Sequence, residues 1–126
     1  MENQKLEQCF YLEHLINIQE LEKKIIEYFS KEQKLLLDHF RHANIVSRKA
    51  DECGYFANIK TNPTRPKIQV NGFTNSLNLS LNGVVIGGAM IYIENGLLSM
   101  IECYSWEDND IFIKLLSSDI NKKVYS

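Results

Sequence analysis

The sequence lacks the features that mark a membrane-spanning or secreted protein. Its apolar runs are too short to cross a bilayer, and its first residues contain no basic stretch followed by an apolar one. Its cysteines, Cys9, Cys53 and Cys103, are odd in number and widely spaced, which argues against a disulfide framework or a Cys-x-x-Cys zinc site. We therefore expect a cytoplasmic protein whose cysteines are buried or half-buried as small hydrophobic residues.

Basic residues are missing from more than a third of the chain. Between Ile68 and Ile113 there is no Lys or Arg, and five carboxylates give that stretch a formal charge of −5. The whole chain carries only −2. This balance disfavours nucleic acid and anionic membranes as partners, because both bind basic surfaces.

What the chain does contain is ordinary for one globular domain. It has 126 residues, of which 44% are hydrophobic and 24% charged, and we detect no internal repeat, low-complexity tract or linker. We expect residues 1–126 to form a single domain.

The first third predicts two helices. Between Leu6 and Phe29 there is no Gly or Pro, and apolar residues recur at helical spacing. Ser30 to Gln33 fits a capping box that would start a second helix. That helix is expected to run through Leu35 to about His42.

The rest of the chain predicts strands. Asn44–Arg48 and Tyr55–Lys60 are rich in β-branched and aromatic residues, and the two prolines place residues 61–66 in a loop. Two Asn-Gly pairs then separate three strands that form a β-meander. These three strands are expected at residues 77–81, 84–93 and 97–104, and a short helix is expected at 108–116. The fold class is therefore α+β, with two N-terminal helices packed on a mostly antiparallel sheet and a short C-terminal helix.

No residue pattern favours a catalytic, cofactor or metal site. His39 and His42, with Asp38, are adjacent on a helix but lack a further ligand, so we expect a partly exposed pair at the helix end. No local motif pairs a cysteine with a histidine. Gly87 and Gly88 lie within a strand pattern, which favours a bulge or a close backbone approach over a phosphate loop. We expect that the protein is not an enzyme.

The acidic stretch supplies the candidate binding residues. Aromatic residues near the end of the last strand are a type that is enriched at interface hot spots. Carboxylates beside them would complement a basic protein surface. The predicted partner-binding residues are Glu94, Glu102, Tyr104, Trp106, Glu107, Asp108 and Asp110. The equally weighted alternative is a solvated sheet edge with Trp106 folded into the core.

The segment Gly88–Trp106, GAMIYIENGLLSMIECYSW, resembles a pattern in small bacterial immunity proteins of polymorphic or contact-dependent toxin systems. In these, a Gly-Ala strand turns at Asn-Gly or Asp-Gly and returns on a strand that ends near Leu-Glu-x-Tyr/Phe. The resemblance implies a cytoplasmic protein that binds and neutralises a cognate toxin domain, in many cases a nuclease with a basic cleft. It assigns no contact residue.

Two other functions stay open at this point. One is a small-molecule-binding or enzymatic domain with a pocket between helices and sheet, which would need convergent polar groups in that pocket. The other is a structural subunit or adaptor, for which an obligate oligomer would be the sign.

Overall fold

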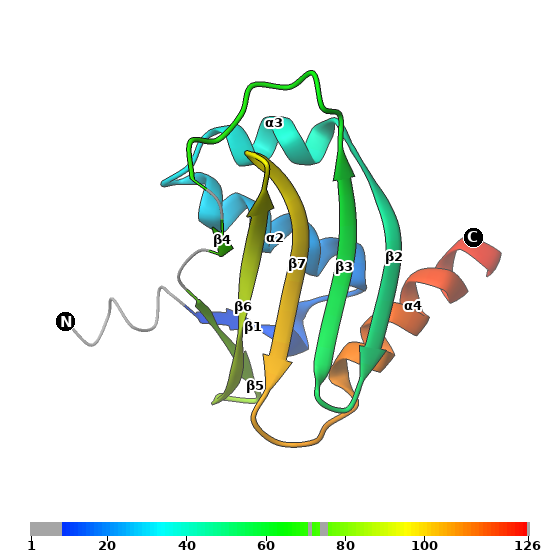
Figure 1. The fold of residues 1–126 in the computed structure, drawn as a ribbon. Helices are drawn as coiled ribbons and strands as arrows, with labels where there is room; N and C mark the ends of the chain where they lie inside the picture. The colour runs from blue at the N-terminus through cyan, green and yellow to red at the C-terminus, as the bar shows by residue number, and fades with distance from the viewer. Residues whose placement is uncertain (1–8, 71, 74–75, 126) are drawn as a thin grey trace.

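The computed structural model describes residues 9–70, 72–73 and 76–125 of the chain. Two helices follow a short strand and a 3-10 turn, six strands come next, and a helix ends the described part of the chain (Figure 1). The elements are β1 (Cys9–Tyr11), η1 (Leu12–His14), α2 (Ile18–Ser30), α3 (Leu35–Arg41), β2 (Ala43–Asp51), β3 (Gly54–Thr61), β4 (Gly72–Phe73), β5 (Leu77–Leu81), β6 (Val84–Glu94), β7 (Leu97–Ser105) and α4 (Ile111–Tyr125). The α+β class is therefore confirmed.

Within the described residues, the strands join in one mixed sheet of order β1-β5-β6-β7-β3-β2, and β4 pairs with β6 beyond the end of β5. The β1–β5 pair is parallel and the other pairs are antiparallel. The predicted meander is formed by β5, β6 and β7. Its turns have positive φ at Asn82 (51°) and Asn95 (54°) and at the glycine after each, as type I′ turns require.

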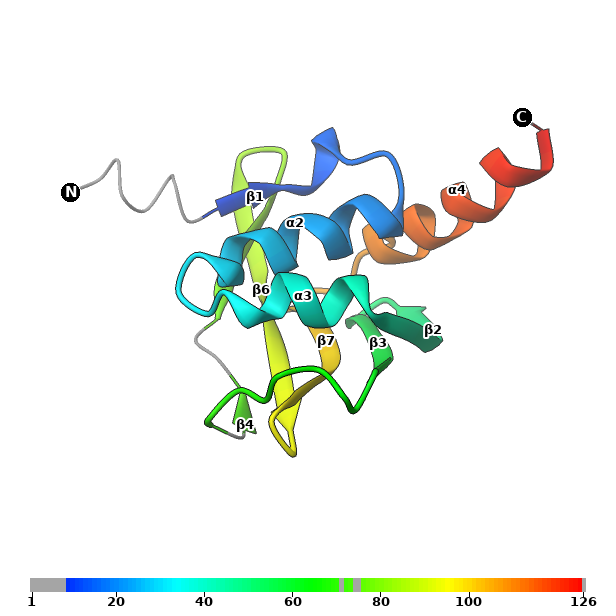
Figure 2. The ribbon, with the colours of Figure 1, turned by 90° about the horizontal axis from the view of Figure 1, so that it is seen from above.

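Helices α2 and α3 cover one face of the sheet, and the opposite face carries no described helix (Figures 1 and 2). The core lies between these layers and includes Leu21, Ile25, Leu36, Ile91 and Ile101, each fully buried. Helix α4 packs against α2 and against the β2–β3 side of the sheet. Since one sheet face is covered, the alternate side chains of β3, β6 and β7 point outward on the open face.

The N-terminal helix is shorter than its apolar spacing predicts. Residues 9–11 instead form β1, where Phe10 pairs with Leu79 of β5. Helix α2 begins after Asn17, whose side chain accepts a hydrogen bond from the backbone N–H of Glu20 at 2.9 Å. The Glu20 carboxylate in turn accepts from the N–H of Ile16. This reciprocal cap sets the helix start, and part of the predicted helix, residues 6–8, lies outside the described residues.

The capping box predicted at Ser30 is wrong. Ser30 is the last residue of α2, and its hydroxyl donates to the backbone carbonyl of Glu27 instead of capping a new helix. Helix α3 begins at Leu35 without a side-chain cap at Lys34. The C-terminal helix also differs from its prediction, since it begins at Ile111 and reaches Tyr125.

Candidate functional site at the acidic end of the sheet

Three connections, two between strands and one from β7 to α4, meet at one end of the sheet. The β2–β3 turn, the β5–β6 turn and the segment between β7 and α4 lie together at the bottom of Figure 1. Backbone hydrogen bonds join them, because the N–H of Ser105 donates to Cys53 at 2.8 Å and the N–H of Trp106 donates to Ile86 at 2.7 Å. The N–H of Asn109 also donates to the carbonyl of Glu52 at 3.1 Å. The connections therefore form one continuous surface.

This surface is rich in carboxylates. Glu107, Asp108 and Asp110 follow β7, as the sequence predicts, and the β2–β3 turn adds Asp51 and Glu52. All five side chains belong to exposed residues. Asp51 Oδ1 accepts hydrogen bonds from the backbone N–H groups of Cys53 (2.8 Å) and Gly54 (3.0 Å), which sets the turn. Asp110 pairs with Lys114 at 3.4 Å.

Apolar side chains lie among these carboxylates. Trp106 is 64% exposed, and Val84 and Val85 at the start of β6 are 62% and 36% exposed. The alternative in which Trp106 folds into the core is therefore wrong, because its backbone N–H is held by β6 while its ring projects outward. We name this surface the acidic end. It comprises Asp51, Glu52, Val84, Val85, Trp106, Glu107, Asp108 and Asp110.

Two of the predicted binding residues lie on the open face of the sheet instead. Glu102 and Tyr104 point outward from β7 and are partly buried. The Tyr92 hydroxyl donates to Glu102 Oε1 at 2.7 Å, which raises the pKa of Tyr92. The Tyr104 hydroxyl and the hydroxyl of Ser76 are 2.8 Å apart. These residues connect the acidic end to the middle of the open face.

Glu94 is not part of the same surface. It ends β6 at the Asn95-Gly96 turn, opposite the acidic end across the nine-residue strand β7. A strand of that length spans about 30 Å. Glu94, one of the seven predicted binding residues, therefore lies apart from the acidic end, because the β6–β7 hairpin carries it to the far end.

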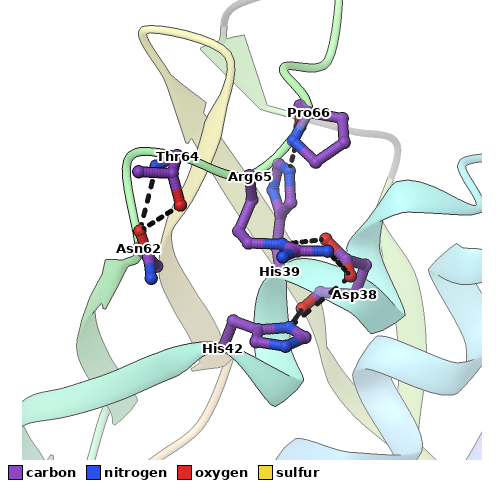
Figure 3. Close-up of polar contacts among 7 residues, drawn as sticks. All are labelled: Asp38, His39, His42, Asn62, Thr64, Arg65 and Pro66. Atoms are coloured by element: carbon purple, nitrogen blue, oxygen red, sulfur yellow. Dashed lines mark hydrogen bonds and ion pairs between the residues drawn. The ribbon is translucent and has the colours of Figure 1, made fainter.

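The far end carries four Arg and Lys side chains. We name it the basic end, and its residues are Arg41, Lys60, Arg65 and Lys67. Figure 3 shows how Arg65 makes two hydrogen bonds to the Asp38 carboxylate, at 2.7 and 2.9 Å. This contact lowers the pKa of Asp38 and raises the pKa of Arg65. The molecule thus separates negative from positive charge along its strands.

His39 is completely buried, so the predicted exposed pair of histidines is wrong for this residue. Its Nδ1 accepts the backbone N–H of Leu98 at 3.2 Å, and its Nε2 lies 2.6 Å from the carbonyl oxygen of Pro66. These partners require a neutral ring that carries its proton on Nε2. Both nitrogens are therefore used within the fold. His42 is exposed, as predicted, and its Nδ1 lies 2.9 Å from the Asp38 carbonyl (Figure 3).

A buried ion pair, whose partners are far apart in sequence, lies between α2 and the sheet. Glu22 is 1% exposed, and its carboxylate accepts hydrogen bonds from Arg48 Nε (2.8 Å) and Nη2 (3.0 Å) on β2. The Tyr55 hydroxyl on β3 donates to the same carboxylate. Contact with Glu22 raises the pKa of Arg48, whereas burial is the main cause that raises the pKa of Tyr55. Its charge suggests the polar face of the helix, but its spacing of four from Ile18 and three from Ile25 places it on the buried stripe of α2.

The cysteines fall in different environments. Cys103 is buried, as expected, and burial raises the pKa of its thiol. Cys53 is exposed at the acidic end, where its Sγ lies 4.0 Å from Asp108, so the expectation of burial is wrong for it. The side chain of Cys9 lies outside the described residues. Within the described part of the chain, no hydrogen bond joins a cysteine to a histidine.

Across residues 9–70, 72–73 and 76–125, no three or more His, Cys, Asp or Glu side chains gather in a way that could hold a metal ion. The helices of this same part of the chain are all too short or too polar to cross a membrane. Comparisons of the chain with protein-family models, with curated proteins and with solved structures find no match.

Proposed function

We propose that this protein is an immunity-type inhibitor that binds a basic surface on a cognate toxin domain through its acidic end and acts without catalysis. The observation that carries the proposal is the composition of that end. Three connections bring five exposed carboxylates around an exposed tryptophan and two exposed valines. The compartment we propose for the complex is the cytoplasm.

The chemistry of this surface suits a protein partner. Carboxylates attract a basic surface over several ångströms and speed productive encounters, whereas an aromatic anchor provides affinity once water is expelled. The Trp106 backbone is held to β6 by its bond to Ile86, and the segment after it is joined to the β2–β3 turn through Asn109 and Glu52. An anchor held in this way loses little conformational freedom on binding.

The resemblance to immunity proteins supports the same reading. The segment Gly88–Trp106 forms most of β6, all of β7 and the first residue after it. The hairpin therefore ends at Trp106, inside the acidic end. A toxin that cleaves nucleic acid would present a basic cleft of complementary charge.

The test is co-purification with the product of the gene directly upstream, together with rescue of cells that express that product. The first variant is Trp106→Ala, and the second is the charge reversal Glu107→Lys/Asp108→Lys. The matched control, Glu32→Lys/Glu94→Lys, makes the same change in net charge at exposed positions outside the acidic end. Unfolding temperatures measured for every variant ensure that only folded proteins are compared.

We expect wild type and the control to form the complex and rescue the cells, and we expect both acidic-end variants to lose affinity. A hot-spot tryptophan contributes about 2 kcal/mol or more, which is about thirtyfold in Kd. A complex that tolerates both acidic-end variants would refute the proposed surface. No complex and no rescue by the wild type would refute the inhibitor function.

A further inference from the structure

A second candidate binding site lies between helix α2 and the N-terminal segment β1–η1. The segment β1–η1 runs beside α2 (Figure 2). Residues of both segments line a groove of about 350 Å³. Phe10, Tyr11 and His14 line it from the N-terminal segment. Helix α2 contributes Lys24 and Tyr28, and the residue that caps its C-terminus, Lys31, completes this side. We name it the aromatic groove, and it shares no residue with the acidic end.

The aromatic rings of this groove are held in place by one another. Phe10 meets Tyr28 edge to face, with ring centroids 5.8 Å apart and planes at 86°. Tyr11 lies 5.5 Å from the ring of His14. Phe10 and Tyr28 are partly buried, whereas Tyr11 is 39% exposed. The rings therefore form a preorganised surface for a flat apolar group.

Cations border the same rings. Lys24 and Tyr28 are four residues apart on α2, and Lys31, the C-cap three residues further, keeps helical backbone angles, so the three share one face. Lys31 Nζ lies 5.6 Å from the centroid of the Tyr28 ring, within the range of a cation–π contact. Within the described residues, no ion pair joins Lys24 or Lys31 to a carboxylate. Their charges are thus available to a ligand.

Size and charge narrow the class of ligand. The volume is at the small end for sites that bind metabolites, so it suits one small molecule and not a folded partner. Glu27 lies between the two lysines on the helix and also lines the groove, which leaves a net charge of +1 from these three side chains. That balance disfavours a polyanion such as nucleic acid. It favours a small molecule that combines a planar ring with one anionic group.

We propose that the aromatic groove binds a nucleoside monophosphate, with the base stacked on the Tyr11 and Tyr28 rings and the phosphate between Lys24 and Lys31. Stacking on aromatic side chains is favourable for any base, since every base has a π face. Charge-assisted hydrogen bonds from two lysines fix the phosphate. The site is independent of the proposed inhibitor function.

The test compares three probes on the whole protein: AMP, adenosine and inorganic phosphate. Binding is measured by isothermal titration calorimetry and by the rise in unfolding temperature that a native-state ligand produces. The double variant Lys24→Gln/Lys31→Gln removes both cations. The matched control is Lys23→Gln/Lys34→Gln, which removes two exposed lysines outside the groove.

We expect AMP to bind the wild type and the control more tightly than adenosine or phosphate does. The groove variant should lose about tenfold or more in AMP affinity, because each charged hydrogen bond contributes about 1.5 kcal/mol or more. Four outcomes would overturn the proposal. They are no binding of millimolar AMP, equal binding of adenosine, equal binding of phosphate, and equal loss in the control variant.

Discussion

Gly87 lies on β6 directly beside the end of β7. A Cβ atom there would be 1.9 Å from the carbonyl oxygen of Tyr104, and one on Gly88 would be 2.5 Å from the Tyr104 hydroxyl oxygen. The register also shifts at this point, between Leu79 and Ser80 of β5. The sequence prediction of a bulge or close approach at these glycines is therefore confirmed on both counts. The physical reason for glycine is the absence of space for any side chain.

We predict that Gly87→Ala destabilises the protein by about 3 kcal/mol, because the added methyl group meets a backbone atom that cannot move alone. Urea-induced unfolding measures the free energy of unfolding. The control is Val84→Ala at the start of the same strand, which is exposed and should change stability by about 0.5 kcal/mol or less. Equal effects for the two variants would contradict the steric argument.

The ion pair of Glu22 and Arg48 links two elements of the fold. It joins helix α2 to strand β2 in the space between the helical layer and the sheet. A single substitution leaves a buried charge without its partner, which lowers the free energy of unfolding. Replacing both residues leaves no unpaired charge in the core. We therefore predict that Glu22→Met and Arg48→Met each cost about 3 kcal/mol or more. The double variant should be more stable than either single variant.

A double-mutant cycle on the unfolding free energy checks this prediction. Conversely, additive losses would show that the ion pair does not couple the helix to the strand. The variant Tyr55→Phe is a third test of the same contact, with a smaller expected loss of stability. It removes only the hydroxyl that donates to Glu22 and should cost about 1 kcal/mol.

His39 connects three elements, since it sits on α3 and bonds to β7 and to the segment after β3. Replacing it with Leu keeps the bulk but leaves the N–H of Leu98 and the carbonyl of Pro66 without their partner. We predict a loss of about 2 kcal/mol or more in the free energy of unfolding. Hydrogen exchange of the Leu98 amide should also become faster. The control His42→Leu, at an exposed position nearby, should have a smaller effect, and an unchanged Leu98 exchange rate in His39→Leu would argue against the contact.

For the whole molecule, the main feature is the separation of an acidic end from a basic end. If the acidic end binds a basic partner, the association rate should fall as salt is added, because screening weakens the long-range attraction. We predict that Glu107→Lys/Asp108→Lys lowers the rate by about tenfold or more at low salt and flattens its salt dependence. Stopped-flow or surface plasmon resonance measures both. Glu94→Lys, at the far end, should retain the wild-type dependence of the association rate on salt. A weaker salt dependence in this variant would show that the net charge of the protein, and not the acidic end, sets the rate.

Part of this organisation could be predicted from residue patterns alone. The alternation of Leu77, Leu79 and Leu81 and the two Asn-Gly turns determined the meander, because strand period and positive φ are local properties. The apolar spacing in α2 and α3 determined their existence as helices. It did not determine that residues 9–11 leave the helix, because β1 depends on pairing with β5, which lies far along the chain.

The candidate site was also predicted only in part from the sequence. The charge pattern alone identified Glu107, Asp108 and Trp106, since they are adjacent in sequence and follow a recognisable strand. Only the tertiary structure added Asp51 and Glu52 and removed Glu94, because antiparallel pairing of β3 with β7 brings one turn close and carries the other to the far end. Likewise, helical spacing places Glu22 on the apolar stripe of α2, but only the tertiary structure supplies Arg48 and Tyr55 as its partners. Local periodicity determines which elements form, whereas the approach of distant strands decides which side chains share a surface.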